Sequence, residues 1–110
     1  MKLAQETLNA TENLRDMDVT EMVNVLRTKN IVWSWGARGW TNHRNRIIAF
    51  RVSGRKFSGN VAIMCNASDL MDIHFCSNRG NLKHKIENVF IGDMISQIDE
   101  YVEKVEAYAY

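Results

Sequence analysis

The sequence predicts a single two-layer α+β domain. It should contain an antiparallel meander of four or five strands, with N- and C-terminal helices packed on one face of the sheet. Residues 46–76 alternate apolar and polar side chains between turn signals, as half-buried strands do. Residues 19–26 and 94–108 repeat apolar residues every three or four positions, as amphipathic helices do. With 110 residues, 45% of them hydrophobic, the chain is long enough to build one core of its own.

The first 17 residues show weak periodicity and are rich in Asn, Thr and Glu. We expect them to form a loosely ordered or helical lead-in, and residues 18–110 to form the domain. Asp18 and Glu21 match a capping box, which satisfies free backbone N–H groups at a helix start. A helix is therefore expected from this point to Lys29–Asn30.

Ile31–Trp35 alternates β-branched and aromatic residues and is predicted to be the first strand. Gly36–Asn45 is predicted to be a ten-residue loop, in which Trp40 is expected to be exposed. A second strand should follow over residues 46–52. Ser53–Lys56 then matches a two-residue hairpin turn with glycine at its first central position.

The strand register of the two central hairpins can be derived from their turns. In the first, Ser53 opposite Lys56 implies the pairs Val52–Phe57, Phe50–Gly59 and Ile48–Val61. In the second, Asn66 opposite Leu70 implies the pairs Cys65–Met71, Ile63–Ile73 and Val61–Phe75. Because alternate strand residues share a face, both registers build one continuous apolar face. Its members are Ile48, Phe50, Val52, Phe57, Val61, Ile63, Cys65, Met71, Ile73 and Phe75.

A turn at residues 78–81 should lead to a weaker last strand with Leu82 and Ile86. Asp93 can then cap a helix with the apolar stripe Met94, Ile95, Ile98, Tyr101, Val102, Val105 and Tyr108. If both helices cover the apolar face, the other face stays open to water or to a partner. That face would present Arg51, Ser58, Asn60, Met64, Asp72, His74 and Cys76.

Charge is unevenly distributed along the chain. The formal net charge is only +1, yet residues 27–86 hold eleven Lys or Arg against Asp69 and Asp72 alone. The segments on either side are acidic. A basic middle between acidic flanks indicates binding to an acidic or polyanionic partner.

Two short motifs carry a resemblance to known sequences. Gly36-Ala37-Arg38-Gly39-Trp40 follows the first helix and strand, and Asn66-Ala67-Ser68-Asp69 precedes the last helix. In that order they resemble a family of small uncharacterised proteins of bacteriophages and other bacterial mobile elements, over roughly residues 20–105. The family has no established activity, so the resemblance implies only an accessory protein of a phage or mobile element in a bacterial cell.

Catalytic and metal-binding patterns are weak. His74 and Cys76 share one side of a strand, which leaves a small hydrolase with a Cys–His pair as the least favoured alternative. His74, Cys76, His84 and Asp72 lack the spacing of a zinc site. Asp69 is expected to serve its turn. We therefore expect no enzyme, no metal and no cofactor.

The preferred hypothesis is a non-enzymatic binding protein that uses a basic loop and the adjoining sheet. Three tryptophans are interleaved with arginines there, and Trp33 and Trp35 are expected in the core. Arg and Trp are favoured anchors of protein interfaces, and the same pair suits single-stranded nucleic acid. The candidate binding residues are Arg38, Trp40, His43, Arg44, Arg46, Arg51, Arg55 and Lys56.

The partner is expected to be an acidic host or defence protein, or nucleic acid. A single-stranded nucleic-acid-binding module proper is the main alternative. A homodimer through a strand edge or the acidic last helix also stays open. The longest apolar run, Val61–Cys65, is too short to cross a bilayer, so no membrane association and a cytoplasmic location are expected.

Overall fold

The structure is a computed structural model that describes residues 3–9, 16, 19–27 and 35–102. A five-stranded antiparallel sheet in the order β1-β2-β3-β4-β5 confirms the predicted α+β meander. The strands are β1 (Arg38–His43), β2 (Ile47–Ser53), β3 (Ser58–Cys65), β4 (Met71–Cys76) and β5 (Leu82–Val89). The helices are α1 (Gln5–Asn9), α2 (Val19–Arg27) and α4 (Ile91–Val102).

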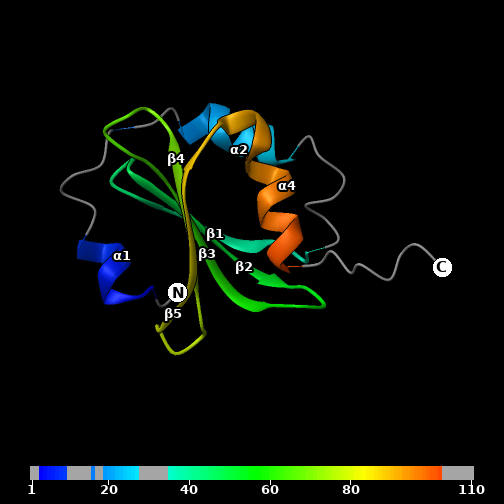
Figure 1. The fold of residues 1–110 in the computed structure, drawn as a ribbon. Helices are drawn as coiled ribbons and strands as arrows, with labels where there is room; N and C mark the ends of the chain where they lie inside the picture. Colours follow the sequence, from blue (N-terminus) through cyan, green and yellow to red (C-terminus); the bar gives the residue numbers. More distant parts are fainter. Residues whose placement is uncertain (1–2, 10–15, 17–18, 28–34, 103–110) are drawn as a thin grey trace.

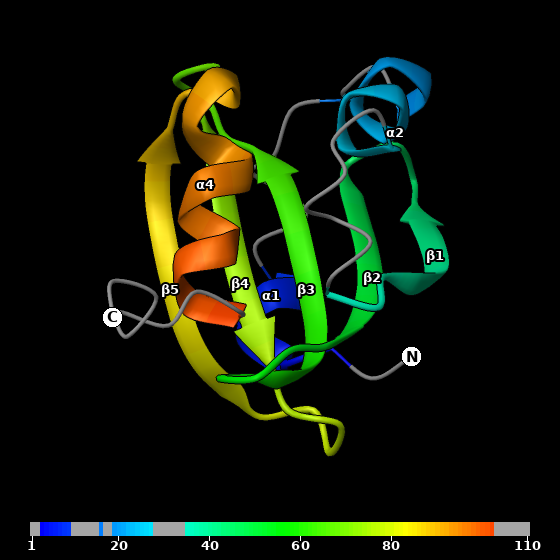
Figure 2. The same cartoon turned by 90° about the vertical axis from the view of Figure 1, so that its right-hand side faces the viewer.

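Helices α2 and α4 lie on one face of the sheet, as expected (Figures 1 and 2). Met22 and Leu26 of α2 and Met94, Ile98 and Val102 of α4 are buried in the main core. All ten residues of the predicted apolar face belong to this core or pack against it. Trp35 is fully buried beside them, and its indole Nε1 donates a hydrogen bond of 2.9 Å to the buried Asp99 carboxylate.

The prediction of an open second face is wrong. Asn60, Met64, His74 and Cys76 are all buried there. Helix α1 and the residues just before it lie on this face, opposite α4 (Figure 1), and Leu3 and Ala4 join a second, smaller core. Short apolar side chains such as Ala49 and Ala62 make the face flat enough for a segment to rest on it. Residues 3–9 therefore supply a cover that their weak periodicity did not indicate.

The predicted loop 36–45 is instead largely the edge strand β1. It pairs with β2, with Thr41 opposite Ala49 and His43 opposite Ile47. Arg44 and Asn45 both have positive φ angles of 54° and 59°, as a type I′ hairpin turn requires. Hydrogen bonds between the Asn42 and Asn45 amides hold this turn without glycine. The predicted strand 31–35 falls mostly outside the described residues, and Trp35 itself lies in a turn.

One predicted register is confirmed and one is wrong. Cys65 pairs with Met71, as the second turn predicted. In the first hairpin Ser53 pairs with Ser58 rather than with Lys56, so every pair is displaced by two residues. A register displaced by two residues keeps each side chain on the same face of the sheet. The alternation of apolar and polar residues therefore cannot distinguish the two registers. The ring of Phe57, not Phe50, therefore covers Gly59.

The first hairpin turn is determined by α4. The carbonyl oxygen of Val102 accepts hydrogen bonds from the N–H groups of Lys56 (2.9 Å) and Phe57 (3.2 Å). A side chain at Gly54 would collide with Val102, since an added Cβ would lie 2.3 Å from its carbonyl oxygen. The glycine is needed for this close approach and has no positive φ angle, contrary to the predicted turn type.

Helix α4 begins at Ile91, two residues before the predicted cap Asp93, which lies in its first turn. The stripe from Met94 to Val102 is confirmed, with Ile95 and Tyr101 half-buried against the core. Its predicted continuation to Val105 and Tyr108 lies outside the described residues, as does the predicted cap Asp18.

Candidate functional site

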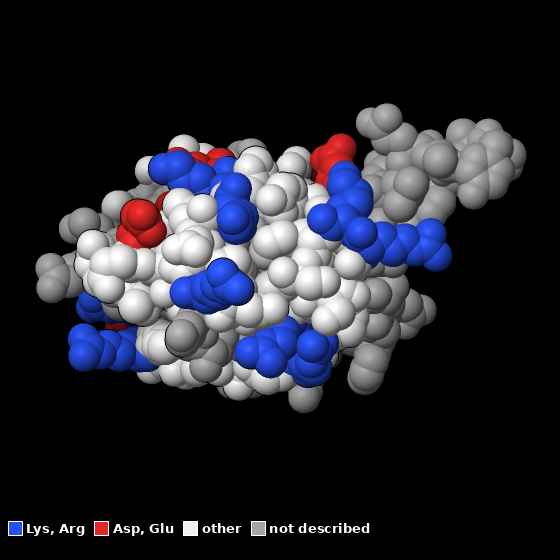
Figure 3. Space-filling view, turned by 90° about the horizontal axis from the view of Figure 1, so that it is seen from below, with Lys and Arg blue, Asp and Glu red and all other residues white. Residues whose placement is uncertain are grey.

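The strand directions sort the candidate residues between the two ends of the sheet. In this meander β1, β3 and β5 begin at the same end at which β2 and β4 finish. That end, called the basic end below, carries six cations: Arg38, Arg51, Arg55, Lys56, Arg79 and Lys83. Figure 3 views the molecule from this side and shows separate Lys and Arg groups spread over a mostly uncharged surface, with acidic groups in fewer places.

The opposite end is predominantly acidic. It carries Asp16, Glu21, Asp69, Asp72 and Asp93, contributed by the segment before α2, α2, the β3–β4 turn, the start of β4 and the start of α4. Arg44 and Arg46 also lie here, and Arg46 forms an ion pair of 3.0 Å with Asp16. The fold therefore separates positive from negative charge along the strand direction.

Seven of the eight predicted binding residues thus fall into two groups, and the eighth, Trp40, lies between them on β1. Arg38, Arg51, Arg55 and Lys56 lie at the basic end. His43, Arg44 and Arg46 lie at the other end of β1 and in the turn that follows it. His43 is half-buried, and its Nε2 atom has no hydrogen-bond partner within the described part of the chain.

Trp40 belongs to the core-facing side of β1. Its ring stacks on Phe50, with centroids 4.5 Å apart, and it packs against the main core. The expectation of an exposed Trp40 is therefore wrong: the ring is half-buried. Phe50 is fully buried beneath it, so this edge of the core is closed by an aromatic pair.

Arg38 and Arg51 are direct partners across the β1–β2 ladder. Both are exposed. The Arg38 guanidinium donates hydrogen bonds to the Gly36 carbonyl oxygen (2.9 Å) and to Ser53 Oγ (3.1 Å). A hollow of about 490 Å³ opens here, lined by Arg38, Gly39, Trp40, Thr41 and Arg51. The structure thus brings together two arginines that are thirteen residues apart in sequence.

The remaining cations of the basic end are carried by turns and by the start of β5. Arg55 and Lys56 lie in the β2–β3 turn, where the Lys56 ammonium donates a hydrogen bond to the Glu100 carbonyl oxygen. Arg79 lies in the β4–β5 turn and Lys83 near the start of β5, and both are exposed. Neither of these last two was among the predicted binding residues, because both follow the basic loop by more than thirty residues.

His74 and Cys76 form a buried polar cluster with α1. Thr7 Oγ1 lies 2.7 Å from His74 Nδ1 and 3.7 Å from Cys76 Sγ, and the N–H of Ala4 donates to Cys76 Sγ over 3.4 Å. Burial lowers the pKa of His74 below its usual 6.5, while the nearby Asp72 carboxylate opposes the shift. The pair is 8% and 0% exposed, respectively, and its hydrogen bonds hold the N-terminal segment on the sheet.

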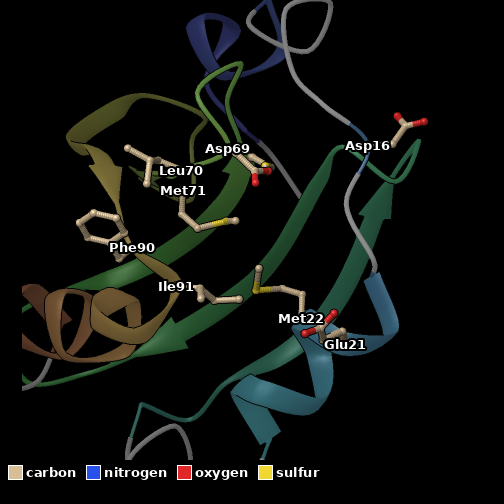
Figure 4. Close-up of a pocket in the computed structure, with 9 residues that line it drawn as sticks. Asp16, Glu21, Met22, Asp69, Leu70, Met71, Phe90 and Ile91 are labelled. Atoms are coloured by element: carbon tan, nitrogen blue, oxygen red, sulfur yellow. The ribbon is translucent and has the colours of Figure 1, made fainter.

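A second hollow lies at the acidic end (Figure 4). It measures about 420 Å³ and lies between α2, the β3–β4 turn and the start of α4. Its floor is apolar, and the exposed Phe90 and Ile91 stand at its border. The lining residues are Asp16, Glu21, Met22, Cys65, Asp69, Leu70, Met71, Phe90 and Ile91.

Within residues 3–9, 16, 19–27 and 35–102, no three His, Cys, Asp or Glu side chains gather as a metal site would require. No described helix is long and apolar enough to span a membrane. Comparison with known proteins found no matching family model, no similar curated protein and no similar solved structure. The relation to phage and mobile-element proteins stays a prediction from the two motifs.

Proposed function

We propose that this chain is a non-enzymatic binding protein whose basic end engages an acidic surface of a partner protein. The observation that carries this proposal is the separation of charge along the sheet. Six cations from three separate stretches of sequence share one end of the fold, and most described acids lie elsewhere. Such a potential steers an oppositely charged partner toward one end of the molecule.

The aromatic side chains favour a protein partner over single-stranded nucleic acid. Single-strand binding uses open aromatic faces on which bases stack. Near the basic end, Trp40 stacks on Phe50, and Tyr101 stacks on His84 with centroids 4.5 Å apart. Both rings are thus engaged within the molecule. Guanidinium groups, in contrast, pair with carboxylates through two parallel hydrogen bonds and need no ring beside them.

Nucleic acid remains the second candidate because Trp40 lines the same hollow as Arg38 and Arg51. A phosphate on the arginines and a base at the free edge of Trp40 would use that arrangement. An accessory role in a phage or mobile element fits either partner, because such a protein can act simply by binding a host protein or nucleic acid.

The test is fluorescence anisotropy with two labelled probes of equal charge, a glutamate-rich peptide and a short DNA single strand, at low and high salt. We expect the peptide to bind more tightly at low salt and to weaken as salt rises, because exposed charges are screened. Arg79→Ala, which removes an exposed cation at the basic end, should weaken peptide binding. Arg44→Ala, which removes an exposed cation at the acidic end, is the matched control and should leave binding unchanged.

Two outcomes would contradict the proposal. If the DNA strand binds tenfold or more tightly than the peptide, the second candidate replaces the first. If neither probe binds at low salt, the basic end is not a polyanion-binding surface.

A further inference from the structure

Arg38 and Arg51 pair directly across the β1–β2 ladder, which places two positive charges opposite each other. Like charges directly opposite each other on adjacent strands repel and destabilise the pair. Arg38 turns toward Ser53, which shares a face of β2 with Arg51, so both guanidinium groups lie on the same side of the sheet. The two positive charges therefore lie close together at a cost to the stability of the strand pair.

The two side chains differ in how they are held. Two hydrogen bonds, to the Gly36 carbonyl oxygen and to Ser53 Oγ, fix the Arg38 guanidinium and leave further N–H groups available. Arg51 is exposed and forms no ion pair or side-chain hydrogen bond with any described residue. One arginine is therefore oriented in advance and the other is able to close on a ligand in the hollow that both line.

From this arrangement we infer that the hollow at Arg38 and Arg51 binds a phosphate monoester carried by the partner protein, such as a phosphorylated side chain. A phosphate monoester carries a charge of about −1.5 to −2 at neutral pH and three strong acceptor oxygens. It would neutralise both arginines at once and accept hydrogen bonds from both. The inference rests on the proposed function, and it specifies the chemical group that the basic end recognises.

Other oxyanions match the hollow less well. A carboxylate or a phosphodiester carries one negative charge, so it would leave one of the two positive charges uncompensated. Recognition of phosphorylated segments by clustered arginines is a recurrent mode of peptide binding. The remaining cations of the basic end would then meet acidic side chains flanking the phosphorylated residue.

The experiment compares three otherwise identical acidic peptides, with phosphoserine, glutamate or serine at the central position, by isothermal titration calorimetry. We expect the phosphopeptide to bind about tenfold more tightly than the glutamate peptide, because a phosphate monoester offers more negative charge and more acceptor oxygens than a carboxylate. Arg51→Ala should abolish this preference. Arg51→Lys should restore only part of it, since an ammonium cannot form the paired hydrogen bonds of a guanidinium.

Arg44→Ala is again the matched control and should keep the full preference. Inorganic phosphate at constant ionic strength should raise the melting temperature of the parent but not of Arg51→Ala, because a ligand of the native state stabilises it. Equal binding of the phosphoserine and glutamate peptides would overturn the inference while leaving the proposed function intact. A preference retained by Arg51→Ala would likewise show that the phosphate lies elsewhere.

Discussion

Gly54→Ala is expected to destabilise the fold, because it separates α4 from the β2–β3 turn. A Cβ at position 54 would lie 2.3 Å from the carbonyl oxygen of Val102 and 2.4 Å from its Cγ1, well inside the 3.0 Å that such contacts require. The oxygen belongs to the backbone, so no flexible side chain can move away. It also accepts the hydrogen bonds from Lys56 and Phe57, which a displacement of α4 would lengthen.

The expected cost follows from these contacts. Overpacking of this kind costs about 1–3 kcal/mol. Weakening two backbone hydrogen bonds adds about 1 kcal/mol each. A loss of about 3–5 kcal/mol is a large part of the 5–15 kcal/mol typical of a domain of this size. It should lower the melting temperature by more than about 10 °C.

Gly92→Ala is the matched control, because an added Cβ there meets no atom within 4 Å and lies in an α-helix. This change should stabilise the protein by about 0.4–1 kcal/mol through the lower entropy of the unfolded chain. Urea unfolding followed by circular dichroism measures both variants. The docking of α4 on the turn is refuted if Gly54→Ala is as stable as the parent.

Three further predictions concern the core and the buried polar cluster. Ile98 is fully buried, so Ile98→Asp should leave little folded protein in a circular dichroism melt, whereas Ser96→Ala on the exposed side of α4 should melt near the parent temperature. Cys65 and Cys76 are free, buried and on opposite faces of the sheet. A thiol reagent should therefore react slowly with the native protein and should detect two thiols after unfolding without reductant. Detecting no thiols would contradict the strand register. Burial lowers the pKa of His74, so the folded state binds fewer protons than the unfolded state and stability should fall as pH drops below 6.5. His74→Gln should flatten this part of the curve of stability against pH. An unchanged curve would show that His74 does not take up a proton on unfolding.

Local sequence was sufficient where one short pattern specified one structure. The Asn66–Leu70 turn is an example, since the Asn66 side chain accepts hydrogen bonds from the N–H groups of Ser68 and Leu70 and closes the turn by itself. The register of β3 and β4 therefore follows from the residues between them. The apolar stripe of α4 could also be predicted from the sequence, because its residues recur at helical spacing whatever they pack against.

Only part of the candidate site could be predicted from the sequence. Sequence order placed Arg38 and Arg44 in one predicted loop, but a strand of six residues separates the two ends of that segment in space. Arg79 and Lys83 joined the basic end from a different part of the chain. Proximity in sequence is a poor guide to proximity in a meander, because each hairpin returns distant residues to the same end.

The sequence by itself determined helices α2 and α4, strands β2 to β5, the apolar face and the excess of cations in the middle of the chain. These depend on side-chain periodicity and composition, which are local properties. Only the tertiary structure decided which turn the β2–β3 hairpin adopts, what covers the second face, and which arginines meet. Each of these depends on contacts between residues far apart in sequence: Val102 with Gly54, Thr7 with His74, and Arg38 with Arg51. Such contacts form only when the whole sheet and its covering helices are assembled, so no local pattern encodes them.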